Sequence, residues 1–160
     1  MPTLPFRPGP VPTGNRTARL LWTAIVDVGP SHDLGASALG HRFLVPITGG
    51  RLYDGPDSHG LSGQVLSGSA DRQLLRPDGA KELDALYEMR TDARQVITVR
   101  NRVIVDPSRR PEGYAMSALT AKVADGPLAW LNRRVLIGTL QSLRPEHSKV
   151  VVRAWIAVNH

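Results

Sequence analysis

Cysteine is absent from this 160-residue sequence, and aromatic residues make up only 5% of it. Without cysteine, the chain can form neither disulfides nor the cysteine-ligated zinc and iron–sulfur sites of small metalloproteins. A chain of this length buries roughly 70% of the surface that its unfolded form exposes, so it can hold a core without such links. The composition therefore describes one small globular domain.

Long apolar runs are also missing. No stretch approaches the roughly 20 apolar residues that a membrane-spanning helix requires. The segment from Met1 to Gly14 is rich in proline and lacks the apolar region of a secretory signal peptide. We therefore expect a cytoplasmic protein with no membrane partner.

The motifs of several enzyme classes are absent as well. The sequence contains no Walker-type phosphate-binding loop, no G-x-S-x-G nucleophile elbow and no H-E-x-x-H zinc motif. Its five histidines are scattered along the chain rather than spaced as the ligands of one metal ion. We expect neither a metal nor an organic cofactor.

Basic residues outnumber acidic ones by 20 to 14, which gives a net charge of +6. Half of this excess comes from Arg7, Arg16 and Arg19, which precede the first acidic residue, Asp27. The remaining charges are interleaved, which argues against the continuous basic patch of a nucleic-acid-binding protein. We expect a proline-rich basic arm over residues 1–19 and no nucleic-acid partner. Because such an arm can lie along a second subunit, we also expect a homodimer.

Short apolar and β-branched runs, separated by clusters of Gly, Pro, Asp and Ser, dominate the rest of the chain. This pattern is typical of strands joined by turns. The expected strands are Leu20–Val28, Arg42–Thr48, Arg51–Tyr53, Leu61–Leu66, Ala70–Arg76, Leu83–Arg90, Gln95–Val105, Arg134–Leu143 and Lys149–Val158. Helical signals are sparse, with Leu128–Arg133 the better candidate and Ser117–Val123 the weaker one.

The short connections favour antiparallel neighbours. We predict an all-β fold over residues 20–160, an antiparallel up-and-down β-barrel of about 8–10 strands with one or two short helices. In Gln95–Val105, Asn101 shares one face with apolar residues, whereas the other face is mixed. The pattern leaves open which face lines the interior, which could hold side chains or one small ligand.

Charged residues inside strand-like runs face either solvent or the interior. A charge that faces the interior is costly unless it is paired, so interior charges are expected only in a wet pocket. Asp71 and Asp84 lie on strands joined by the Pro77–Gly79 turn, and sharing one pocket would raise the pKa of one carboxyl. Alternatively, they form salt bridges with Arg42 or Arg100 that fix the strand register.

Six stretches, in order along the chain, carry a further signal: Gly40–Gly50, Gly55–Pro56, Gly63–Asp71, Arg76–Gly79, Leu83–Tyr87 and Trp130–Asn132. Together they resemble a bacterial and fungal family, domain-of-unknown-function family 3237, also called uncharacterised-protein family 0311. The resemblance implies an antiparallel β-barrel from about Leu20 onward. The chain departs from the family at Arg72, where tryptophan is usual, and at Leu86, where arginine is usual. We therefore expect an altered pocket.

We expect a cofactor-independent enzyme that catalyses proton transfer, in an isomerisation, cyclisation or elimination, on an apolar substrate with a carbonyl or enol group. Asp71 or Asp84 would move the proton, and Arg42 would stabilise the developing negative charge. The predicted substrate-binding residues are Tyr87, Glu88, Arg100, Trp130 and Asn132. Trp130 could instead plug one end of the barrel while Asn132 caps backbone groups. The alternative function is a non-catalytic barrel that binds a small molecule.

Overall fold

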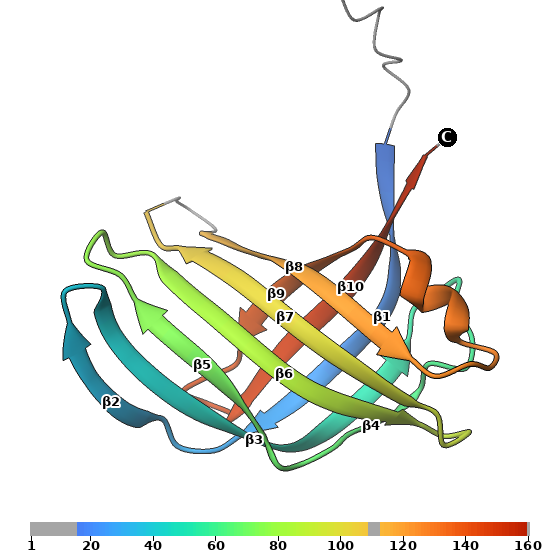
Figure 1. The fold of residues 1–160 in the computed structure, drawn as a ribbon, viewed down its shortest axis with the longest axis horizontal. Helices are drawn as coiled ribbons and strands as arrows, with labels where there is room; N and C mark the ends of the chain where they lie inside the picture. The colour runs from blue at the N-terminus through green and yellow to red at the C-terminus, as the bar shows by residue number, and fades with distance from the viewer. Residues whose placement is uncertain (1–15, 109–112, 160) are drawn as a thin grey trace, which may run out of the picture.

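The computed structural model describes residues 16–108 and 113–159, which fold into a twisted antiparallel barrel (Figure 1). One short 3₁₀ helix, η1 (Ala129–Arg133), follows β8. The strands are β1 (Arg16–Val28), β2 (His32–Ser37), β3 (Gly40–Asp54), β4 (Gly63–Val65), β5 (Ser69–Leu75), β6 (Lys81–Thr91), β7 (Val96–Asp106), β8 (Tyr114–Val123), β9 (Leu136–Ser142) and β10 (Lys149–Asn159).

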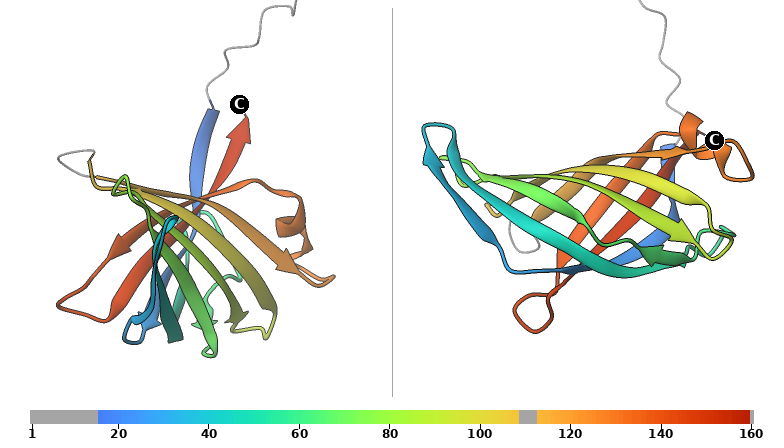
Figure 2. Two further views of the ribbon diagram at one scale, coloured as in Figure 1. Left: turned by 60° about the vertical axis from the view of Figure 1, so that its left-hand side comes forward. Right: turned by 60° about the horizontal axis from the view of Figure 1, so that its bottom comes forward.

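The barrel is closed, has eight strands around its wall and follows the predicted up-and-down order (Figures 1 and 2). β1 completes the ring because it pairs with β10 along one edge and with β3 along the other. β4 and β5 share one place in the wall, since each pairs with β3 on one side and β6 on the other. β2 extends β3 as a hairpin beyond the ring.

Most expected strands are present with bounds shifted by a few residues. Arg42–Thr48 and Arg51–Tyr53 are parts of one strand, β3. The chain stays continuous through Gly49 and Gly50 because a bulge shifts the register between β1 and β3. β2 has no counterpart among the expected strands, since all of its residues are exposed and no apolar alternation marks it.

The predicted helix at Ser117–Val123 is wrong, and the segment belongs to β8. Ser117, Leu119 and Ala121 are buried while the residues between them are exposed, which is the two-residue period of a strand. The expected helix at Leu128–Arg133 is confirmed as η1.

One end of the barrel is filled by side chains. The fully buried side chains at this end are those of Trp22, Leu61, Met89, Ile97 and Leu131. η1 closes this end, and the side chain of Asn132 ties it to the last residue of β8. The Asn132 Oδ1 atom accepts from the Val123 N–H at 2.9 Å, and its Nδ2 atom donates to the Val123 carbonyl at 2.8 Å.

The strand boundary at the N-terminal side differs from the expected one. β1 begins at Arg16, so residues 16–19 belong to a strand that pairs with β10, whereas the pairing of β1 with β3 begins at Trp22. This first part of β1 therefore extends with β10 beyond the closed ring (Figure 1). Residues 1–15 of the expected arm lie outside the described residues. No helix in the described part of the chain has the length and hydropathy needed to cross a bilayer.

Candidate functional site

A cavity of about 440 Å³ occupies the other end of the barrel, where the β2–β3 hairpin begins. Volumes of roughly 300–1,000 Å³ are usual for sites that bind small molecules. Inward-facing side chains of the barrel strands line it, so the alternation of each strand decides which residues reach the cavity.

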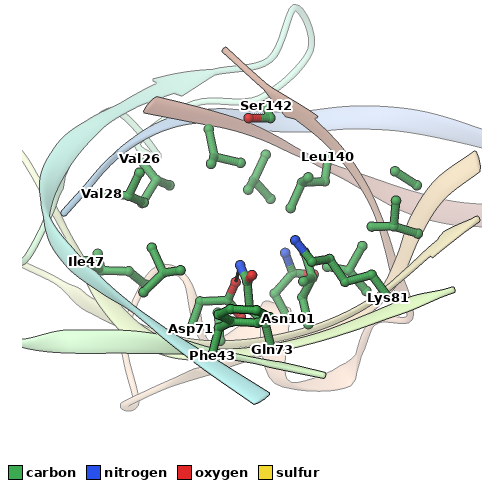
Figure 3. A pocket seen from close by; sticks show the side chains of 18 of the residues that line it. Val26, Val28, Phe43, Ile47, Asp71, Gln73, Lys81, Asn101, Leu140 and Ser142 are labelled. Atoms are coloured by element: carbon green, nitrogen blue, oxygen red, sulfur yellow. Dashed lines mark hydrogen bonds between the residues drawn. The ribbon is translucent and has the colours of Figure 1, made fainter. Parts of the chain in front are cut away.

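The cavity has an apolar wall and a polar wall (Figure 3). The apolar wall comes from β1, β3, β9 and β10, with residues such as Val26, Ile47 and Leu140. Most of the polar side chains come from three consecutive strands: Asp71 and Gln73 from β5, Lys81 and Tyr87 from β6, and Asn101 from β7. Ser142 of β9 lies on the opposite side, and Ser31 and Arg144 line the cavity from connecting segments. A ligand in this cavity therefore meets hydrogen-bonding groups mainly along one side.

Strand register places Asp71, Ala85 and Asn101 in one row across β5, β6 and β7. Neighbouring side chains in such a row stand roughly 5 Å apart. The carboxyl group and the amide therefore flank the small side chain of Ala85, which leaves room between them.

The two oxygens of the Asp71 carboxyl group differ in their hydrogen bonding. Its Oδ2 atom accepts a hydrogen bond from the Gln73 amide at 2.8 Å. Its Oδ1 atom is buried and has no hydrogen-bond partner among the described residues. Burial raises the pKa of Asp71, and the Asp84 charge adds to this shift, whereas the Gln73 hydrogen bond, a backbone hydrogen bond from Asp84 and the charge of Lys81 oppose it only in part. The carboxyl group is thus closer to the range in which it can both accept and donate a proton near neutral pH.

Five more buried polar atoms lack a hydrogen-bond partner in the described part of the chain. Trp22 Nε1 and Glu88 Oε2 lie away from the cavity, whereas Tyr87 OH, Asn101 Oδ1 and Ser117 Oγ lie on the inner side of the barrel wall. These last three residues are only 1%, 2% and 7% exposed. Burial, reinforced by the nearby Asp71 charge, raises the pKa of Tyr87, so its hydroxyl group stays protonated and can donate. Unpaired buried polar groups cost about 1–3 kcal/mol each and are uncommon in protein interiors.

Gly138 of β9 makes room for two of these atoms. A Cβ at Gly138 would lie 1.9 Å from Ser117 Oγ and 3.4 Å from Asn101 Oδ1. The hydroxyl group and the amide oxygen therefore lie under the same glycine, on the inner surface of the barrel.

Asp71 and Tyr87, both predicted from the sequence, line this cavity. The structure corrects the expectation that Asp84 joins them. Asp71 is in register with Ala85, so Asp84 points to the opposite face of the sheet. There Arg100 donates to both Asp84 oxygens, at 3.1 and 3.0 Å, and holds the pKa of that carboxyl below its usual value.

The remaining predicted residues also lie away from the cavity. Arg42 and Arg100 are exposed on the outer face, because they alternate with inward-facing residues of β3 and β7. Glu88 shares the outer face of β6 with Asp84. Trp130 packs against the core at the closed end, and Asn132 holds the backbone of Val123. We therefore do not place these five residues in the site.

The sequence does not single out three of the residues that line the cavity, Gln73, Lys81 and Asn101. It also does not single out Ser117, which lies near Asn101 under Gly138. One signal was present for Asn101, a lone polar residue on an otherwise apolar strand face. Among the described residues, no group of three or more His, Asp or Glu side chains gathers as metal ligands do. The site instead offers a carboxyl group, two amides, an ammonium group and hydroxyl groups.

Known proteins share this fold. A UPF0311 protein of Rhodopseudomonas palustris is 35% identical over 83 residues, which span 52% of this chain and 52% of that protein. The crystal structure of a conserved protein of unknown function from the same species matches with a TM-score of 0.79 at 25% identity, covering 91% of this chain and 100% of that one. A crystal structure described as an enzyme from Penicillium herquei matches with a TM-score of 0.72 at 23% identity, covering 94% of this chain and 99% of that one, a likeness of fold alone.

The sequence profile of a family described as "Protein of unknown function (DUF3237)" matches residues 17–157. This range covers all strands of the barrel except the outermost residues of β1 and β10. The chain therefore belongs to the DUF3237 family.

Proposed function

We propose that this barrel is a cofactor-independent enzyme that catalyses proton transfer on an apolar substrate with a carbonyl or enol group. One observation carries the proposal. Asp71 Oδ1, Tyr87 OH and Asn101 Oδ1 are buried without partners among the described residues, and their side chains line the apolar cavity. Unpaired groups of this kind cost stability unless a ligand engages them.

In this mechanism, the apolar body of the substrate packs on the wall formed by β1, β3, β9 and β10. Its reacting group lies between Asp71 and Asn101, over the small side chain of Ala85. The Tyr87 hydroxyl donates a hydrogen bond to the substrate oxygen, which stabilises the negative charge that develops there. Asp71 Oδ1 takes a proton from one substrate atom and returns it to another, as an isomerisation, cyclisation or elimination requires.

The fold itself is compatible with catalysis. The structural neighbour from Penicillium herquei is described as an enzyme. Because one fold supports many functions, the proposal rests on the interior residues of this chain and not on that likeness.

The test compares two Asp→Asn variants. The small molecule that co-purifies with the protein is identified by mass spectrometry and then incubated in deuterated buffer with wild type, Asp71→Asn or Asp84→Asn. We expect wild type and Asp84→Asn to convert the molecule, or to exchange its acidic proton, at similar rates. Asp71→Asn should be slower by about 100-fold or more while still binding it, because general acid–base groups contribute at least that much.

Unchanged turnover in Asp71→Asn would overturn the role of this carboxyl group. If wild type binds the molecule without converting it or exchanging its protons, and Asp71→Asn lowers only the affinity, the barrel is a non-catalytic binding protein.

A further inference from the structure

The mouth of the cavity carries positive charge. Lys81, the first residue of β6, is half-buried and lines the cavity (Figure 3). Its ammonium nitrogen points toward the cavity interior. No ion pair joins Lys81 to a carboxylate within 4.0 Å among the described residues, although four other Lys and Arg side chains have such partners.

A second cation lies near the same opening. Arg144, in the connection between β9 and β10, lines the cavity and donates from Nη2 to the Gly29 carbonyl at 2.6 Å. The backbone thus holds the guanidinium group, and no carboxylate among the described residues forms an ion pair with it. Of the described residues that line the cavity, Asp71 is the acidic one, and it lies deeper, in the row with Ala85 and Asn101.

This arrangement places two positive charges at the opening and one carboxyl group inside. We propose that the cavity selects an apolar organic anion, whose charged group pairs with Lys81 at the mouth while its uncharged end reaches Asp71 and Asn101. An ammonium group at the edge of an apolar cavity is stabilised by an anion that shares its partly desolvated surroundings. The inference rests on the proposed function, because it specifies the substrate class of the same cavity.

Two matched fluorescent probes test the charge preference. Anilinonaphthalene sulfonate carries a negative charge, whereas N-phenylnaphthylamine has a similar aromatic body without the charge. We expect Lys81→Met to weaken binding of the sulfonate about tenfold, the usual size for loss of one charge-assisted contact of roughly 1.4 kcal/mol. Binding of the neutral probe should change less than about twofold.

Two further variants serve as controls. Lys122→Met removes the same charge from the outer face of β8 and should leave both affinities unchanged. Lys81→Arg keeps the charge and should retain most of the preference for the sulfonate. Equal loss for both probes in Lys81→Met, or the same loss in Lys122→Met, would overturn the inference.

A third variant, Ala85→Phe, separates a failure of this inference from a failure of the proposed ligand site. Ala85→Phe fills the space between Asp71 and Asn101. If neither probe loses affinity in this variant, the probes bind elsewhere and the cavity itself is not the binding site. If both lose affinity in Ala85→Phe and Lys81→Met does not discriminate between them, the cavity binds ligands without selecting anions.

Discussion

At the scale of single residues, the Tyr87 hydroxyl group costs stability but is placed where it can bind a ligand. It is buried, points into the barrel and has no hydrogen-bond partner among the described residues. A phenylalanine would fill the same space without an unpaired polar atom. A group that costs stability and lines a cavity is expected to serve a ligand instead.

Tyr87→Phe should therefore keep or raise the melting temperature, because it removes an unpaired buried hydroxyl. For a domain of this size, each 1 kcal/mol corresponds to roughly 2–4 °C. Affinity for the co-purified small molecule should fall about 3- to 10-fold through loss of one hydrogen bond. Calorimetry measures both quantities, and Tyr53→Phe, a half-exposed outer tyrosine, should change neither. A lower melting temperature with unchanged affinity would make the hydroxyl a purely structural group.

The two aspartates should respond to pH with opposite signs. Burial raises the pKa of Asp71 above the ordinary value of 3.8, so the folded state holds its proton more tightly than the unfolded state. Its favourable contribution is complete below pH 3.8 and is lost as the pH rises through the raised pKa. Asp71→Asn should thus be more stable than wild type at pH 7, and the advantage should shrink toward pH 4.

Asp84 is the matched comparison. The Arg100 hydrogen bonds lower the pKa of Asp84, so its contribution is present above pH 3.8 and is lost as the pH falls through the lowered value. Asp84→Asn should be less stable than wild type at pH 7, by less than about 1 kcal/mol because the pair is exposed. Urea unfolding between pH 3 and 8 measures both variants. If both substitutions changed the stability at pH 7 in the same direction, the placement of Asp71 inside the barrel and Asp84 outside it would be contradicted.

The sequence could identify Asp71 and Asp84 as unusual but could not tell them apart. Both lie in strand-like runs, and the strand period assigns residues to two faces without saying which face is inside. The inside is fixed by the register with neighbouring strands, which places Ala85, and not Asp84, beside Asp71.

At the scale of elements, the path of β3 along β1 depends on Gly50. Gly50 has φ = 146°, a left-handed conformation that side chains rarely adopt, and a Cβ there would lie 2.3 Å from the Ile25 carbonyl oxygen. The close approach lets β3 continue along β1 past the bulge, so that the first part of β3 lines the cavity while the second part closes the ring.

Gly50→Ala should destabilise the protein by about 3 kcal/mol, because backbone strain and a main-chain clash add together. Gly79→Ala is the control, since Gly79 also has positive φ but a Cβ there meets nothing within 4 Å. It should cost only about 1 kcal/mol. Urea midpoints measure the stability of both variants. If both substitutions destabilised the protein equally, the Ile25 carbonyl of β1 would not crowd a Cβ at position 50.

The sequence predicts most elements because apolar alternation and turn residues mark them. It misses β2, whose exposed residues carry no alternation. It misassigns β8, because small residues such as Ala118 and Ala121 suit a helix locally, whereas pairing with β7 and β9 requires a strand. Tertiary pairing overrides local preference in both cases.

At the scale of the whole molecule, the barrel has a closed end and an open end with different roles. The large buried side chains and η1 stabilise one end, so the other can keep a cavity. The net charge of +6 does not identify a partner, because outer charges such as Arg100 and Asp84 pair with one another. The homodimer and the cytoplasmic location stay predictions, and sedimentation velocity tests the first.

A native mass spectrum of the protein purified directly from its source, recorded beside that of Ala85→Phe, tests the binding cavity most directly. We expect wild type to carry a small molecule that is released on denaturation and Ala85→Phe, confirmed as folded by circular dichroism, to carry none. A bare wild-type mass, or the same adduct on both proteins, would contradict a ligand site beside Asp71 and Asn101.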